Sequence, residues 1–137
     1  MKWKLEVVPV PVTDVDRAKD FYAEKIGFDL DHDVRVSDET RVVQLTPRGS
    51  ACSIVIGTGL SDMAPGSLRG LQLVVSDIHA ARTQLVERGV EVGEVQVFDS
   101  GSFRPSREGE ALDNVGFAFF SDPDGNGWAL QQISARD

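Results

Sequence analysis

Residues 10–28 read VPVTDVDRAKDFYAEKIGF, and residues 73–92 read LVVSDIHAARTQLVERGVEV. The two segments match at one spacing, 77 minus 14 or 63 residues, which aligns Asp14 with Asp77 and Ala18 with Ala81. Each has a valine-rich run, then an Asp suited to cap a helix, then apolar residues at helical spacing. Gly27 and Gly89 follow and are expected to end the two helices in a left-handed conformation. The chain therefore repeats one unit, in which a strand leads into a helix.

Further strand candidates follow the helix in both halves, at residues 41–47, 50–57, 90–98, 115–120 and 127–133. Pro47 and Gly49 match Pro123 and Gly125 at a spacing of 123 minus 47, or 76. The second half thus carries 76 minus 63, or 13, additional residues before its last hairpin. We expect this surplus to form a long loop at 99–114.

The repeat predicts an α+β fold, with two tandem βαβββ modules that form an open, curved mixed sheet around a cavity. We expect a single domain over 1–137, with module 1 at about 1–60 and module 2 at about 70–137. The Gly-, Ser- and Pro-rich segment at about 57–69 is the predicted linker. A single module cannot cover its own sheet, so the modules pair within one chain or between two, and we expect a homodimer.

Composition excludes several classes of protein. The 22 acidic residues outnumber the 14 Lys and Arg and give a net charge of -8, which disfavours nucleic acid as a partner. No apolar run approaches the roughly 20 residues of a membrane span, and the N-terminus lacks a signal-peptide pattern. Cys52 is the only cysteine, which fits a reducing cytoplasm. We expect a cytoplasmic protein with no membrane or nucleic-acid partner.

Three segments together resemble the vicinal oxygen chelate superfamily, the group of glyoxalase I, extradiol dioxygenases, fosfomycin-resistance thiol transferases and bleomycin-resistance proteins. They are VTDVDRAKDFYAEKIGF at 12–28, GLQLVVSDIHAAR at 70–82 and FFSDPDGNGWALQ at 119–131. In their order and spacing they span residues 12–131, nearly the whole chain. The resemblance implies the doubled fold and a ligand cavity.

In enzymes of this superfamily, His or Gln on the opening strands and Glu on the closing strands hold a divalent metal. The resemblance carries these four positions onto Val7, Gly70, Ser53 and Ala129. None of the four has a carboxylate or an imidazole, and a divalent cation needs several such donors. We therefore expect no metal and no cofactor.

Positions two apart on a strand share a face, so Gln72 and Gln131 are expected to share the cavity face with Gly70 and Ala129. Two neutral amides without an acid make a poor metal site, and we expect them to orient a bound organic molecule. A Gln on a strand is otherwise often a solvent-facing residue. The predicted ligand-binding residues on strands are Val7, Pro9, Ser53, Val55, Gly70, Gln72, Ala129 and Gln131.

Phe103 and Arg104 lie in the expected long loop. As part of a lid, Phe103 would stack on the ligand and Arg104 would meet a carboxylate or phosphate. The alternative is a mobile surface loop without a binding role. The sequence supports both readings.

These features predict a glyoxalase- and bleomycin-resistance-like protein that binds a small organic ligand without catalytic residues of its own. One alternative is an enzyme, either a metal-dependent lyase, isomerase or dioxygenase with non-standard ligands, or a metal-free catalyst. Another alternative is a protein-interaction module with a vestigial pocket. The sequence does not identify the ligand.

Overall fold

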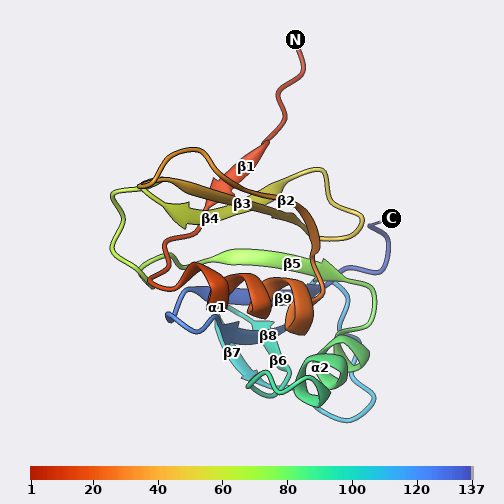
Figure 1. Ribbon diagram of the computed structural model, residues 1–137. Helices are drawn as coiled ribbons and strands as arrows, with labels where there is room; N and C mark the ends of the chain where they lie inside the picture. The colour runs from red at the N-terminus through yellow and green to blue at the C-terminus, as the bar shows by residue number, and fades with distance from the viewer. Residues whose placement is uncertain (137) are drawn as a thin grey trace. The chain divides into compact units, whose positions relative to one another are not determined.

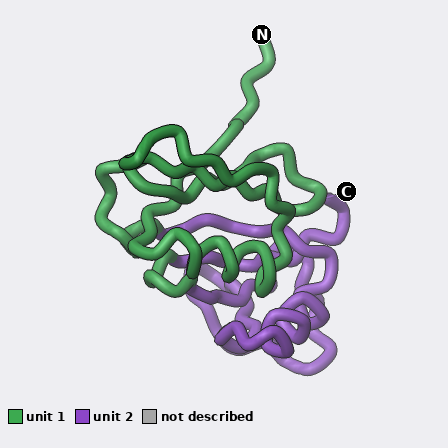
Figure 2. The backbone as a smooth tube through the Cα atoms, in the orientation of Figure 1, with its two compact units in different colours: residues 1–68, 122–126 green, residues 69–121, 127–137 purple. Residues whose placement is uncertain are grey.

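The computed structural model describes residues 1–136 and divides the chain into two compact units (Figures 1 and 2). Unit 1 contains residues 1–68 and 122–126. Unit 2 contains residues 69–121 and the segment that begins at 127. The short turn 122–126 thus belongs to unit 1, although the strands on either side of it belong to unit 2.

Unit 1 has the βαβββ order that the repeat predicts. Its elements are β1 (Val7–Pro9), α1 (Val15–Asp20), the π-helix η1 (Phe21–Ile26), β2 (Asp29–Arg35), β3 (Arg41–Thr46) and β4 (Ser53–Thr58). The sheet order is β1-β4-β3-β2, with β1 parallel to β4 and the other pairs antiparallel. Strand β2 was not among the sequence candidates, because its residues DLDHDVR are mostly charged and largely exposed.

The predicted helix signals of unit 1 are confirmed. Asp14 Oδ1 accepts a hydrogen bond from the Arg17 backbone N–H at 3.0 Å, which satisfies a donor at the start of α1. Gly27 ends η1 with a φ of 92°, a left-handed conformation that glycine adopts without steric cost. Between these ends Val15, Ala18, Phe21 and Tyr22 are buried. On strands β3 and β4 the buried apolar residues alternate and are Val43, Leu45, Ile54 and Ile56.

The turn 122–126 is held in unit 1 by a buried hydrogen-bond network. Asp122 Oδ1 accepts from the backbone N–H groups of Asp124 and Asn126, and Gly125 has a φ of 99°. Asp122 Oδ2 accepts from the Tyr22 hydroxyl and from Asn126 Nδ2, both at 2.8 Å. The Asp122 carboxylate therefore holds the turn, whereas Asp124 Oδ1 accepts from the backbone N–H and the hydroxyl of Thr13 at 3.2 and 2.6 Å.

Unit 2 contains one strand more than the repeat predicts. Its elements are β5 (Leu71–Val75), α2 (Ile78–Glu87), β6 (Gln96–Asp99), β7 (Ser102–Pro105), β8 (Gly116–Ser121) and β9 (Gly127–Gln132). The sheet order is β5-β9-β8-β6-β7, with β5 parallel to β9. The helix again starts at a capping Asp, since Asp77 Oδ1 accepts from Ala80 N–H at 3.1 Å.

The expectation of a long loop at 99–114 was wrong for its first part. Residues 102–105 form β7, which pairs with β6 in a hairpin. Ser100 and Gly101, with φ values of 54° and 89°, make a two-residue turn whose twist matches that of the paired strands. The α+β class with open sheets is confirmed, as two sheets of four and five strands. Among residues 1–136, no helix has both the length and the apolar character needed to span a bilayer.

Candidate functional site

Four of the predicted ligand-binding residues lie together on the sheet of unit 1. Val7 is opposite Ser53, and Pro9 is opposite Val55, on the parallel strands β1 and β4. These pairs share one face of the sheet, because directly opposed residues point to the same side and residues two apart do so as well. The buried residues Ile54 and Ile56 occupy the other face. We call the first face the open face of unit 1.

The Ser53 hydroxyl is already engaged within this face. It lies 2.6 Å from Thr46 Oγ1 and accepts a hydrogen bond from Gln44 Nε2 at 3.3 Å. Ser53 is also buried, with 5% of its surface exposed. Its role in the structure is therefore to connect β3 and β4 through polar side chains.

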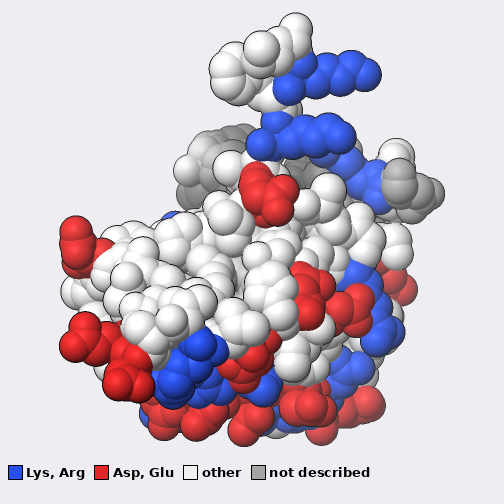
Figure 3. Space-filling view, turned by 45° about the horizontal axis from the view of Figure 1, so that its top comes forward, with Lys and Arg blue, Asp and Glu red and all other residues white. Residues whose placement is uncertain are grey.

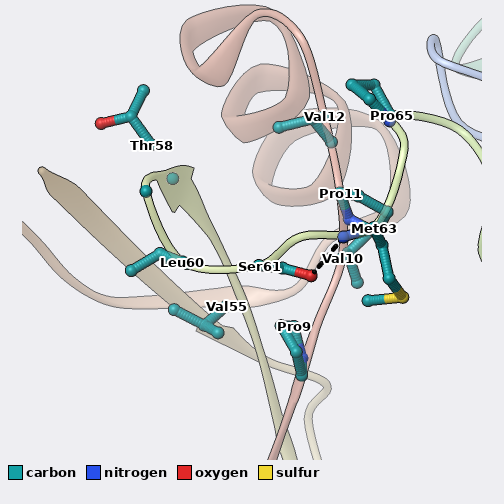
Figure 4. A pocket seen from close by; sticks show the side chains of 12 residues that line it. Pro9, Val10, Pro11, Val12, Val55, Thr58, Leu60, Ser61, Met63 and Pro65 are labelled. Carbon is teal, nitrogen blue, oxygen red and sulfur yellow. Dashed lines mark hydrogen bonds between the residues drawn. The ribbon is translucent and has the colours of Figure 1, made fainter.

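Pro9 and Val55 also line a pocket of about 290 Å³ in unit 1 (Figure 4). The pocket lies between the segment 9–12 and residues 57–65, which are the end of β4 and the loop after it. Leu60, Met63 and Pro65 add apolar surface to it. Its volume is near the lower limit for sites that hold a drug-sized ligand. Proline fixes its own backbone, so the four-residue wall at 9–12, with Pro9 and Pro11, is stiff.

The sheet of unit 2 brings Gln72, Ala129 and Gln131 together. Ala129 is directly opposite Gln72 on the parallel strands β5 and β9. Gln72 Nε2 donates a hydrogen bond to Gln131 Oε1 at 3.1 Å, and Gln131 Nε2 donates to the Asn114 carbonyl at 2.9 Å. Within the described chain, Gln72 Oε1 has no hydrogen-bond partner and faces solvent, since Gln72 is exposed. We call this face the open face of unit 2.

The second glutamine of the closing strand faces the other way. Gln132 Oε1 accepts from the Ile78 backbone N–H at 3.0 Å, at the start of α2. Its Nε2 donates to Asp113 Oδ1. Gln132 therefore has a structural role, in agreement with its position one residue beyond Gln131.

Gly70 lies one residue before β5 and has a φ of 89°, so it is not part of the sheet. The strand register places Gln72 opposite Ala129 in unit 2, as it places Val7 opposite Ser53 in unit 1. By strand pairing, Gln72 rather than Gly70 is thus the counterpart of Val7. The difference arises because unit 1 has four residues between β1 and the capping Asp14, whereas unit 2 has Ser76 alone between β5 and Asp77.

Four phenylalanines also lie on the open face of unit 2, and only Phe103 was a predicted site residue. Phe119 is opposite Ala129, Phe117 is opposite Gln131, and Phe103 is opposite Phe98. The rings contact one another, with Phe103 perpendicular to both Phe117 and Phe119 at centroid distances of 5.4 and 5.3 Å. We call this cluster the phenylalanine platform; its members are Phe98, Phe103, Phe117 and Phe119.

A sequence signal for the platform exists in the segment GFAFF at 116–120. Alternation along a strand separates Phe117 and Phe119 from Phe120, and Phe120 is buried and stacks on Trp128 at 6.2 Å. The pairing of Phe119 with Ala129 follows from the hairpin that the 122–126 turn closes. Phe98 joins the platform through the β6–β7 hairpin, which the sequence did not predict.

Arg104 and Phe103 point to opposite sides of the sheet, because adjacent residues of a strand alternate. Arg104 is opposite Val97, a buried residue, and its guanidinium pairs with Asp99 at 3.1 Å and Glu110 at 2.5 Å. The hydrogen bond from Arg104, aided by the Arg107 N–H, lowers the pKa of Glu110 to about 2. The positive charge of Arg104 is thus neutralised by acids close to it in the sequence.

The metal positions implied by the superfamily do not fit a divalent cation. By strand pairing, Gln72 takes the place of Gly70 in this set. Val7 and Ala129 have no side-chain donor, and the Ser53 hydroxyl is engaged with Thr46 and Gln44. The Gln72 amide is then the one donor that remains in the set, and a divalent cation needs several. Within residues 1–136, no three His, Cys, Asp or Glu side chains form a group that could hold a metal ion.

Comparison with known proteins identifies the family. The family model of the Glyoxalase/Bleomycin resistance protein/Dioxygenase superfamily matches residues 4–130. The chain belongs to this superfamily.

Solved structures of related proteins show the same fold over almost the full chain. TnmS3, an antibiotic binding protein from Streptomyces sp. CB03234, is 38% identical, with 97% of this chain and 98% of that chain covered and a TM-score of 0.75. A superfamily member from Sphaerobacter thermophilus DSM 20745 is 26% identical, with coverages of 96% and 98% and a TM-score of 0.73.

The sequence is also similar to a protein from Bacillus subtilis (strain 168), YetH. The two are 28% identical over 133 residues, which are 94% of this chain and 98% of YetH.

Proposed function

We propose that the protein binds a small organic molecule without a metal, and that binding itself is its function. The observation that carries this proposal is the hydrogen-bonded pair Gln72–Gln131 on the open face of unit 2. The pair presents a polar group to solvent. Its neighbours on this face, Ala129, Phe117 and Phe119, are uncharged. A few amides within a mostly apolar surface are typical of sites that bind neutral organic ligands.

The similarity to TnmS3 supports the same proposal. TnmS3 is an antibiotic binding protein, and the two chains share 38% of their residues over nearly their full lengths. We extend antibiotic binding to this protein as part of the proposal. Val7, Pro9, Ser53, Val55, Gly70, Gln72, Phe103, Arg104, Ala129 and Gln131 remain the proposed ligand-binding residues, of which Phe103 has the stronger support and Arg104 the weaker.

A thermal-shift screen tests the proposal. Chelator-treated protein is heated with each member of a panel of natural-product antibiotics, and ligands that bind the folded state should raise the Tm in a concentration-dependent way. The bound compound is then extracted and its mass compared with that of the starting compound. A mass that does not change supports a binding protein; a changed mass, or no hit across the panel, would contradict it.

We also propose that the protein is a cytoplasmic homodimer, and that residues 1–6, the N-terminal arm, contact the second copy. The arm precedes β1, an edge strand of its sheet (Figure 1). Trp3 and Leu5 are 87% and 69% exposed, and they alternate with charged residues as in a strand that has one face covered. The single Cys52 fits a reducing cytoplasm.

Charge supports a second copy as the partner of the arm. Lys2, Lys4 and Glu6 give the arm a net charge of +1, so the remainder of the chain has -8 minus 1, or -9. Figure 3 shows basic side chains along the arm, and acidic side chains with basic ones among them over the rest of that view. Opposite charges favour the encounter of two copies.

Sedimentation velocity tests the homodimer. Wild-type protein should sediment as a dimer, and the variant with Trp3→Ser and Leu5→Ser should shift toward monomer. Val86→Ser, which alters another exposed apolar residue on α2, is the matched control and should remain dimeric. A monomeric wild type, or an arm variant that is as dimeric as the control, would refute this proposal.

A further inference from the structure

The phenylalanine platform leaves an unusual amount of aromatic surface in water. Phe98, Phe103 and Phe119 are 45%, 44% and 37% exposed on one face of one sheet. Solvent-facing sheet positions ordinarily carry polar residues, and contiguous exposed apolar patches commonly mark binding sites. The platform is therefore a candidate binding site.

The rings are arranged so that both faces and edges are presented. Phe117 and Phe119 are nearly parallel, with an angle of 8° between their planes, and Phe103 is perpendicular to both, at 82° and 89°. Aromatic rings attract one another in these edge-to-face and offset-parallel geometries because the ring edge is positive and the ring face negative. A further flat aromatic ring can join the cluster through the same contacts.

The platform and the glutamine pair are neighbours on the same face. Ala129 lies between Phe119 on β8 and Gln72 on β5 and is itself 6% exposed, so a ligand would lie over it and reach both. From β8 to β5 is two strand spacings, or about 10 Å. This distance suits a molecule of about two fused rings with one polar group at its end. Gln72 would meet that polar group, because its Oε1 has no partner among the described residues.

The rings and amides of the site have no charge to offer a ligand. The four rings, Ala129 and the two glutamines are neutral. Arg69 lies beside Gly127 at one end of this face and has interaction partners of its own. Arg104 is on the other face with Glu110 and Asp99 as its partners. An ionised group placed over the rings would lose hydration without gaining an ion pair there. Charge therefore favours a neutral occupant.

We infer that the phenylalanine platform is a binding site for a neutral, planar aromatic molecule that carries a carboxamide or a similar hydrogen-bonding group at one edge. This inference rests on the proposed function and specifies its ligand class. The rings stack on or against the platform, and the edge group exchanges hydrogen bonds with the Gln72 amide.

The test uses 2-naphthamide and its saturated analogue, decahydro-2-naphthamide, which is similar in size but not flat or aromatic. Binding is followed by calorimetry and by NMR of the ligand protons. The aromatic probe should bind at least tenfold more tightly than the saturated one, and its protons should shift upfield from the ring currents of the platform. Phe103→Leu and Phe119→Leu should each weaken its binding by about two- to tenfold.

Gln72→Leu should weaken binding of 2-naphthamide but not of naphthalene, which lacks the edge group. Val86→Ala on α2 is the control and should leave all affinities unchanged. Each variant is first checked for an unchanged urea midpoint, which separates binding from folding.

Two results would overturn the inference. One is equal affinity for the flat and saturated probes with no effect of the phenylalanine variants; the other is no binding of 2-naphthamide by a protein that does bind members of the antibiotic panel. In both cases the proposed function stands and the platform is not its aromatic site. If neither the probes nor any panel member bind, the proposed function itself has failed.

Discussion

Replacement of Asn126 by alanine should strongly destabilise the protein. The Asn126 side chain is fully buried and makes three hydrogen bonds in unit 1. Its Nδ2 donates to the Pro11 carbonyl and to Asp122 Oδ2, both at 2.8 Å, and its Oδ1 accepts from the Leu68 N–H at 3.1 Å. Alanine removes all three bonds and leaves their partners in the protein interior.

The size of the effect follows from these contacts. A buried hydrogen bond contributes about 1 kcal/mol, and a bond to a charged group about 1.5–3 kcal/mol, so the loss of two neutral bonds and one bond to Asp122 should total about 3–5 kcal/mol. With an m-value of about 1.5 kcal/mol/M for a protein of this size, the urea midpoint should fall by about 2–3 M. Unfolding would be followed by tryptophan fluorescence, since Trp128 is buried in the native state.

Two further variants make the result interpretable. Tyr22→Phe removes only the hydroxyl that donates to Asp122 Oδ2, and should cost about 1.5–3 kcal/mol, which keeps the native state populated if Asn126→Ala does not fold. Gln84→Ala deletes an amide of similar chemistry from the exposed surface of α2, and should change stability by less than about 0.5 kcal/mol. If the free energy of unfolding of Asn126→Ala lies within about 1 kcal/mol of the wild-type value, the hydrogen-bond network does not hold the turn as described.

Other substitutions should report on other parts of the chain. Gly57→Ala should destabilise unit 1 by about 2 kcal/mol or more, because the added Cβ would lie 1.9 Å from the Arg41 carbonyl oxygen; urea unfolding measures this, and a neutral result would contradict the close approach. The ion pair with Arg104 lowers the pKa of Glu110 to about 2, so the pair stabilises the folded state above about pH 4.5 and this stabilisation is lost as the pH falls toward 2. Glu110→Gln should therefore reduce the change in unfolding free energy between pH 4.5 and 2. A pH dependence identical to that of the wild type would count against the pair. Asp33→Asn should cost about 1 kcal/mol, because it removes the negative charge and one of the two oxygens that accept from Arg41 and Lys19. These hydrogen bonds lower the Asp33 pKa, so the cost should shrink as the pH falls below about 4; a cost that stays constant there would indicate a packing effect instead.

The internal repeat allowed much of the fold to be predicted. Asp14 and Asp77 cap their helices, and Gly27 and Gly89 adopt positive φ values, because caps and left-handed residues depend on local chemistry that a short segment contains. Strand β2 could not be recognised in the same way. Its acidic residues lack an apolar alternation, and it is stabilised by pairing with β3, a contact that the local sequence does not encode.

The candidate site was predictable only in part. Alternation along a strand is a local property, and it predicted that Gln72 and Gln131 lie on one face, where they are hydrogen bonded to each other. The pairing of Gln72 with Ala129 depends on strand register, which alternation does not give. The exclusion of Gly70 from β5 depends on the length of the connection to α2, which differs between the halves. The phenylalanine platform requires strand order: Phe98 and Phe117 are separated by 19 positions and become neighbours on one face only through the β6–β8 pairing.

Native mass spectrometry tests the central claim most directly, because it records bound metal and bound organic ligand on the same ion. Protein purified without chelators would be offered nickel, zinc, manganese or ferrous iron, desalted, and then mixed with the antibiotics that raise its Tm. The account predicts complexes of chain and intact antibiotic whose mass includes no metal. Complexes that form only on chains that hold about one metal ion each would contradict it.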